Sequence, residues 1–209
     1  MNDRTIILGL TGGIGTGKST ASEYLKDKGF LQIDADAISR QITADGSPVL
    51  KVLDSVFGPE GELGVEGHKI LDENGSLMRQ SMADIVFTDE AKKNKLNEIM
   101  LTQIIAIIDD KVKEYRESDS ELKVLLDAPL LLEAGLDSRC DKVMVIVADK
   151  DVRISRVQSR DGISAKQVQD RIDNQMSDDE KTARADYVVD NSKDLNHLYA
   201  QLDKIVEEL

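Results

Sequence analysis

A glycine-rich stretch near the start of the chain carries residue types that bind phosphate groups. Residues 12–19 read G-G-I-G-T-G-K-S, which matches the P-loop pattern G-x-x-x-x-G-K-[ST]. Glycines let successive backbone N–H groups point at phosphate oxygens, and the N-terminus of a following helix adds partial positive charge. We expect Lys18 to reach the β- and γ-phosphates of a nucleoside triphosphate and the Ser19 hydroxyl to bind Mg²⁺.

The loop, two later segments and the chain length argue against several other classes of nucleotide-binding protein. A dinucleotide site would need G-x-G-x-x-G starting at Gly13, but position 18 is a lysine. GTP-binding switches carry N-K-x-D and D-x-x-G, whereas residues 191–194 read N-S-K-D and residues 127–130 read D-A-P-L. A chain of 209 residues is also short for a ring-type or transporter-type ATPase. What remains favours a small-molecule kinase.

Two aspartates stand where such a kinase would need a proton acceptor. Asp34 and Asp36 end the second predicted strand, which neighbours the P-loop strand in a doubly wound sheet. A carboxylate there can accept the proton of an acceptor hydroxyl as the phosphoryl group is transferred. The alternative is purely structural, a helix N-cap followed by an acid in the first turn.

Three arginines follow the fourth predicted strand. Arg156 and Arg160 are four residues apart and share a helix face, and Arg153 lies about one turn earlier. Guanidinium groups placed over the γ-phosphoryl group would neutralise the charge that spreads over its oxygens during transfer. The alternative is a solvated helix face whose arginines pair with Asp151 and Asp161.

Short apolar runs and helical stretches alternate along the chain and would position these residues. Most of the apolar runs are nearly continuous, which is typical of strands buried on both faces of a parallel sheet. The predicted strands are Thr5–Leu10, Phe30–Ile33, Val124–Leu126, Val143–Ala148 and Tyr187–Val189. The predicted helices are Lys18–Lys28, Ala91–Arg116, Asp151–Arg160 and Leu195–Glu208. The pattern predicts an α/β P-loop NTPase fold with a five-stranded, mostly parallel sheet flanked by helices.

Two longer segments interrupt this alternation. A mainly helical excursion separates the second and third strands, and a polar, charged helical stretch separates the fourth and fifth. Excursions at the carboxyl ends of parallel strands commonly build substrate sites and lids. We therefore predict a single domain with a core of residues 1–36, 118–152 and 186–209, a helical acceptor-binding insertion at 37–117 and a lid at 153–185.

Composition narrows the partners and the compartment. The net charge of −13 argues against a nucleic-acid coat protein or a binder of anionic membranes, since both need a positive field. No apolar run is long enough for a signal-peptide core or a membrane span. Cys140 is the only cysteine, which fits a reducing compartment and a packing role. We expect a cytoplasmic protein; the sequence does not predict an oligomeric state.

Several segments together resemble the dephospho-CoA kinase family nearly from end to end. They are L-T-G-G-I-G-T-G-K-S-T at 10–20, I-D-A-D-A-I-S-R-Q at 33–41, D-A-P-L-L-L-E at 127–133, R-V-Q-S-R at 156–160 with Gln175, and A-D-Y-V-V-D-N at 185–191. The resemblance departs at Leu101-Thr102, where the family commonly has His-Pro. Any role of that histidine therefore does not transfer to this chain.

The resemblance implies phosphorylation of the ribose 3′-hydroxyl of dephospho-CoA by MgATP. It places Asp36 as general base, Arg156 and Arg160 as lid arginines over the ATP phosphates, and Asn191 near the adenine. With the motif, the predicted ATP site comprises Gly12, Gly13, Ile14, Gly15, Thr16, Gly17, Lys18, Ser19, Thr20, Arg156 and Asn191. The predicted acceptor site comprises Thr11, Asp36, Arg40 and Arg79.

Some alternatives stay open. Asp127 could hold a magnesium-bound water, as a Walker-B carboxylate does, or it could cap a strand end, and Glu133 has the same ambiguity. The chain could also be a P-loop kinase of another nucleoside-like or nucleotide-like acceptor. A third reading is a non-catalytic ATP-binding regulator that kept the loop.

Overall fold

The computed structural model describes residues 5–87 and 89–209, which form two compact units. One unit comprises the chain up to Asp34 and from Lys111 to Leu209, and the other comprises Ala35–Asp110. The division into core, insertion and lid that the sequence suggests remains a prediction. Over the described ranges, none of the helices has the length and apolar character needed to cross a membrane.

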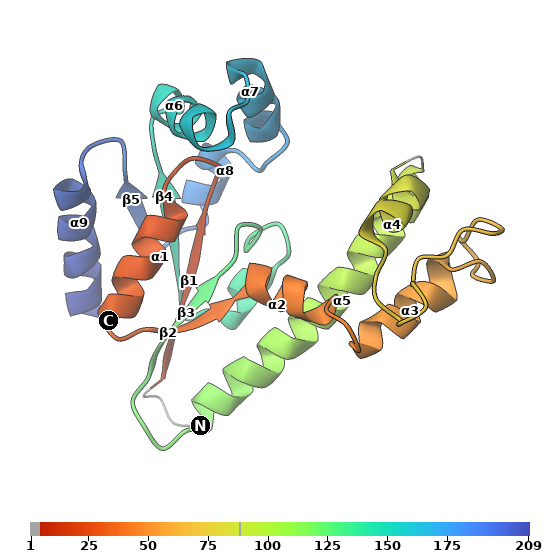
Figure 1. Cartoon of the computed structure of the whole chain (residues 1–209). Helices are drawn as coiled ribbons and strands as arrows, with labels where there is room; N and C mark the ends of the chain where they lie inside the picture. Colours follow the sequence, from red (N-terminus) through yellow and green to blue (C-terminus); the bar gives the residue numbers. More distant parts are fainter. Residues whose placement is uncertain (1–4, 88) are drawn as a thin grey trace. The chain divides into compact units, whose positions relative to one another are not determined.

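The first unit is built on a five-stranded sheet in the order β2-β3-β1-β4-β5, and all of its pairings are parallel (Figure 1). The strands are β1 (Ile6–Gly12), β2 (Leu31–Asp34), β3 (Lys123–Asp127), β4 (Lys142–Val147) and β5 (Tyr187–Asp190). The prediction of an α/β fold with a parallel five-stranded sheet is confirmed. The central β1 is almost entirely buried, as expected for a strand covered on both faces.

The first unit also contains several helices. They are α1 (Lys18–Asp27), α6 (Lys150–Asp161), α7 (Ala165–Asp173), α8 (Asp178–Thr182) and α9 (Leu195–Glu208), with a 3₁₀ turn η1 (Leu136–Arg139). Helices α1 and α9 pack side by side, and Tyr24 stacks on Tyr199 with ring centroids 4.1 Å apart. The predicted charged stretch after β4 divides at Gly162, whose φ of 67° ends α6.

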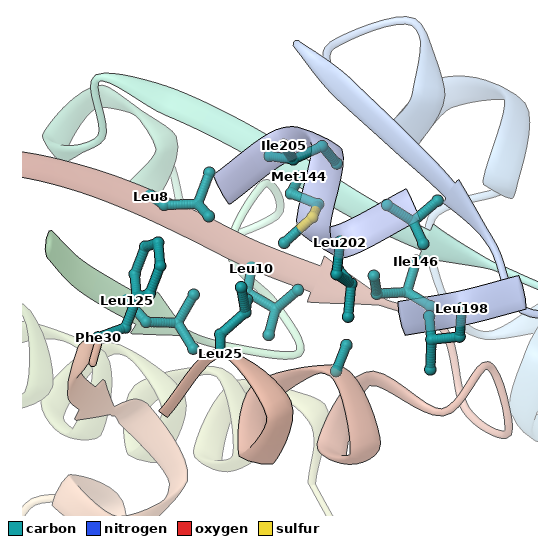
Figure 2. Packing of buried hydrophobic residues seen from close by; sticks show 12 residues of the cluster. Leu8, Leu10, Leu25, Phe30, Leu125, Met144, Ile146, Leu198, Leu202 and Ile205 are labelled. Atoms are coloured by element: carbon teal, nitrogen blue, oxygen red, sulfur yellow. The ribbon is translucent and has the colours of Figure 1, made fainter. Parts of the chain in front are cut away.

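The core of this unit lies between one face of the sheet and helices α1 and α9 (Figure 2). Its side chains are aliphatic with one phenylalanine and one methionine, since the chain is poor in aromatic residues. The buried cluster consists of Leu8, Leu10, Ala21, Leu25, Phe30, Leu125, Met144, Ile146, Val189, Leu198, Leu202 and Ile205. This packing fixes the carboxyl end of β1, from which the P-loop leaves the sheet.

The second unit is helical. It contains α2 (Ala35–Ile42), α3 (Pro48–Phe57), α4 (Arg79–Val86) and most of α5 (Glu90–Arg116). The Ser47 side chain accepts a hydrogen bond from the Val49 N–H and caps α3, and Pro48 occupies the first turn, where no backbone donor is needed. Helix α5 is continuous through Leu101-Thr102.

Candidate active site

The P-loop connects the end of β1 directly to the start of α1. The Thr16 N–H and hydroxyl both donate to the Gly13 carbonyl, at 3.2 and 2.9 Å, and close the loop on itself. Gly15 and Gly17 have φ values of 80° and 87°, which side-chain-bearing residues rarely adopt. Gly17 is the N-cap of α1, so Lys18, Ser19 and Thr20 form the first turn of this helix. This is the strand–loop–helix context that the motif requires.

The side chain of Lys18, the first residue of α1, is held by a carboxylate from the neighbouring strand β3. Its Nζ donates to Asp127 Oδ1, and Asp127 is 5 % exposed at the end of β3. Gln32 of β2 donates through Nε2 to Asp127 Oδ2 and to the Ser22 hydroxyl, both at 2.9 Å. Each oxygen of Asp127 therefore has a partner of its own, and the carboxylate is fixed beside the lysine.

Two buried polar atoms without partners flank Gly17. Asn191 donates through Nδ2 to the Thr16 carbonyl at 2.8 Å, and its Oδ1 accepts nothing. Arg156 Nη1 is also buried and unpaired, and no other buried side-chain N or O atom in residues 5–87 and 89–209 is. A Cβ on Gly17 would overlap Asn191 Nδ2 and lie 3.8 Å from Arg156 Nη1. Because burying such atoms unpaired is costly, they mark a place suited to a polar ligand that offers an acceptor to Arg156 Nη1 and a donor to Asn191 Oδ1.

The other two arginines of α6 are engaged with protein groups. Arg160 donates to Asp161 through Nε at 2.7 Å and Nη2 at 3.1 Å, and this pairing lowers the pKa of Asp161. Arg153 is 5 % exposed, donates to the Ile14 carbonyl and pairs with Asp178. Of the three arginines, the structure thus brings Arg156 to Gly17 with a guanidinium nitrogen unpaired.

The loop that presents Asn191 is braced on both sides. The Asn191 N–H donates to the Val147 carbonyl at 2.8 Å, and Gln201 of α9 bonds the Asp190 N–H and carbonyl. The Ser192 hydroxyl and the Ser192 N–H both donate to Asp190 Oδ1. These hydrogen bonds lower the pKa of Asp190, and the bond from the hydroxyl has the larger effect. Asn191 is consequently held rigidly at the end of β5.

The predicted acceptor residues fall in both units. Thr11 is fully buried in β1, and its hydroxyl donates to the Pro129 carbonyl at 3.0 Å. Asp36 and Arg40 lie one turn apart and exposed on α2, in the second unit. Arg79, the first residue of α4, donates to Thr43 Oγ1 at 3.1 Å just beyond the end of α2. The second unit therefore gathers Asp36, Arg40 and Arg79 around one short helix.

Sequence reasoning missed two residues that the structure ties to this site. Gln32 has no motif around it, and only its strand position opposite Asp127 explains its contact. Lys181 is fully buried and donates to Glu133, so it anchors α8 to the segment after β3. Among the described residues, no three carboxylate, histidine or cysteine side chains cluster to hold a metal ion.

Sheet order, loop and lysine together define a P-loop nucleotide-binding fold. The family model described as dephospho-CoA kinase matches residues 6–197. Enzymes of that name from Fusobacterium nucleatum and Corynebacterium glutamicum are 36 % and 37 % identical over 204 residues, covering 97–98 % of this chain and 98 % of theirs. The chain belongs to the dephospho-CoA kinase family.

Two solved structures are similar to the chain in fold. The chain is similar to TT1252 from Thermus thermophilus, with a TM-score of 0.76, 29 % identity and 99 % of each chain covered. It shares its fold with the dephospho-CoA kinase from Campylobacter jejuni, at a TM-score of 0.71, 24 % identity, and 98 % and 96 % coverage.

Proposed function

We propose that the chain transfers the γ-phosphoryl group of ATP to the ribose 3′-hydroxyl of dephospho-CoA, giving coenzyme A and ADP. The observation that carries the nucleotide part is the pair of unpartnered buried atoms, Arg156 Nη1 and Asn191 Oδ1, beside Gly17 of a complete P-loop. A regular β–α turn would gain nothing by leaving them unpaired, whereas a nucleotide offers partners to both.

The first unit supplies the ATP site in this proposal. Residues 12–20 enclose the phosphates, which accept from loop N–H groups other than those of Ile14, Thr16 and Thr20, and Lys18 and Arg156 balance the phosphate charge. Mg²⁺ would be held by the ATP phosphates and the Ser19 hydroxyl, with Asp127 accepting from a metal-bound water. This fits the donor set, because Mg²⁺ keeps several waters and is commonly bound through few protein groups. When bound, the ion neutralises charge on the β- and γ-phosphates.

The second unit supplies the acceptor groups. Asp36 accepts the proton of the 3′-hydroxyl while the hydroxyl oxygen forms its bond to the γ-phosphorus. The bond from that phosphorus to the bridging oxygen breaks, and ADP leaves with the electron pair. Arg40 and Arg79 would bind anionic groups of dephospho-CoA, with Thr11 contributing from β1. For Arg160 to neutralise charge on the ATP phosphates, its guanidinium leaves Asp161 and donates to a phosphate oxygen instead.

Purified full-length protein with MgATP and a panel of acceptors tests this proposal. We expect coenzyme A to form at least about a hundredfold faster than any phosphorylated nucleoside or nucleotide, since acceptor contacts raise the rate only for the matching substrate. Activity with nucleosides alone would make the chain a kinase of another acceptor. Binding of ATP with no transfer to any acceptor would make it a non-catalytic regulator.

The compartment is a separate expectation. We place the reaction in the cytoplasm, where ATP is abundant and where a chain with one cysteine needs no disulfide.

A further inference from the structure

The backbone of Ile14, in the P-loop, is hydrogen-bonded at both its N–H and its carbonyl by residues from outside the loop. The Ile14 N–H donates to Gln175 Oε1 at 2.9 Å. The Ile14 carbonyl accepts from Arg153 Nε, also at 2.9 Å. Gln175 follows α7 and Arg153 lies in α6, so two segments more than 130 residues away in sequence hold the two consecutive peptide groups that flank the Ile14 Cα.

Two nitrogens of the Arg153 guanidinium donate to protein groups. Besides Ile14, the guanidinium donates through Nη1 to Asp178 Oδ2 at 2.7 Å, and the side chain of Arg153 is 6 % exposed. A Cβ on Gly13 would overlap Arg153 Nη2, so the guanidinium packs directly on the loop backbone. An arginine remains charged when buried, and Asp178 supplies the compensating charge.

Asp178 is itself held in place through α8. Lys181, three residues further on, is fully buried and donates to Glu133. Arg184 donates to Asp137 Oδ2 at 2.7 Å and to the Leu132 carbonyl. These contacts fix α8 on the segment that follows β3, so Asp178 is a rigid anchor for Arg153.

We propose that Arg153, Gln175 and Asp178 form a brace that sets the orientation of the two peptide groups flanking Ile14 and so positions the phosphoryl group that the P-loop holds. Arg153 and Gln175 are positioning residues, and Arg153 does not bind a phosphate. Asp178 acts through Arg153. The proposal rests on the proposed function for its effect on rate, but its structural part concerns the loop alone.

The brace affects turnover more than affinity for ATP. Most phosphate contacts come from other loop N–H groups and Lys18, and these do not need Ile14. A small displacement of the reacting group is enough to slow transfer strongly, because catalysis depends on near-attack geometry. Loosening Ile14 therefore lowers kcat and leaves the KM for ATP nearly unchanged.

Amide hydrogen exchange in the full-length protein tests the structural part without any substrate. We expect the Ile14 N–H to be protected in the wild type and to exchange about tenfold faster in Gln175→Met, the change expected for losing one hydrogen bond. Gln169→Met removes a glutamine that bonds Asp173 on α7 and should leave Ile14 unchanged. Equal exchange at Ile14 in Gln175→Met and the wild type overturns the brace.

Steady-state kinetics test the effect on rate. We expect Arg153→Lys and Asp178→Asn each to lower kcat about tenfold with the KM for ATP within about threefold, and the double variant to be no worse than Arg153→Lys alone. If Arg153 instead bound a phosphate, Asp178→Asn would release its charge and lower the KM for ATP. That result, or additive losses, overturns the proposal.

Matched controls separate these outcomes from general damage. Arg116→Lys and Asp141→Asn change another arginine–carboxylate pair, 2.8 Å apart, and should keep wild-type kcat. Loss of kcat in these controls equal to that in the brace variants overturns the brace. If the wild type makes no coenzyme A, the proposed function fails, and the Ile14 exchange still decides the brace.

Discussion

At the scale of single residues, the site leaves no room for a side chain at Gly17. Gly17 combines a φ of 87° with the close approach of Asn191 and Arg156. Gly29 has a φ of 94° but open space around its Cβ position. Substituting Gly29 therefore tests backbone strain alone, whereas substituting Gly17 tests backbone strain together with the effect on Asn191 and Arg156.

We predict that Gly17→Ala and Gly29→Ala both lower the free energy of unfolding by about 1–2 kcal/mol, the cost of a left-handed backbone with a Cβ. Only Gly17→Ala should weaken ATP binding, by at least about tenfold, because its Cβ displaces Asn191. Urea unfolding and calorimetric titration with ATP measure the two effects. Wild-type ATP affinity in Gly17→Ala would refute the role given to Asn191 and Arg156.

The single cysteine shows how burial suppresses chemistry. Burial, with smaller contributions from Asp137 and Asp141, raises the pKa of the Cys140 thiol to about 12. We predict that iodoacetamide alkylates the native protein at pH 8 about 10³-fold more slowly than the urea-unfolded chain, because the thiolate is the reactive form. Native and unfolded rates within tenfold of each other would contradict the burial of this thiol.

At the scale of elements, the sequence predicts what is local and misses what is distant. The predicted strands and helices agree with the structure to within a few residues, because apolar runs and the glycine pattern are contiguous signals. The partners of Gln32 and Lys181 lie 95 and 48 residues away, so no local pattern marks them. The spacing of Arg153 groups it with Arg156 and Arg160 as a candidate for phosphate binding or for a solvated helix face, whereas its burial against the loop depends on the tertiary fold.

Loss of the ion pair between Lys181 of α8 and Glu133 should lower the free energy of unfolding by a measurable amount. We predict that Glu133→Gln lowers the free energy of unfolding by about 3 kcal/mol, because it leaves the buried Lys181 ammonium without its counter-charge. Lys181→Met in the same chain should recover at least half of the loss. The control Glu23→Gln, from an exposed pair on α1, should change stability by less than about 0.5 kcal/mol. Equal effects at Glu133 and Glu23 in urea unfolding would contradict this account.

At the scale of the whole molecule, charge is distributed unevenly. The net charge is −13, yet residues 151–185 contain seven basic and seven acidic side chains and are neutral. A few placed cations, together with loop N–H groups, can therefore bind polyanionic substrates in an acidic protein. The overall charge bears on large anionic partners and not on the nucleotide site.

The stability of the fold in acid should depend on carboxylates whose pKa values are lowered in the folded protein. Hydrogen bonds from the Val143 N–H and then from Lys142 lower the pKa of Asp186, so its ionised form stabilises the fold above the unfolded value near 4. This contribution is lost as the pH falls through the lower, folded pKa. We predict that Asp186→Asn is less stable than the wild type at pH 7 and that the difference shrinks below about pH 3. A difference independent of pH would contradict the prediction.

Asp36 is the residue proposed to accept the proton of the acceptor hydroxyl. The most direct test is the rate of coenzyme A formation by Asp36→Asn at saturating MgATP and dephospho-CoA, with Asp45→Asn, an exposed aspartate just beyond α2, as the control. We predict that kcat falls about 10²-fold or more in Asp36→Asn, in the range for a general base, while ATP affinity and the control stay at wild-type values. Near-wild-type turnover of Asp36→Asn would contradict the proposed mechanism.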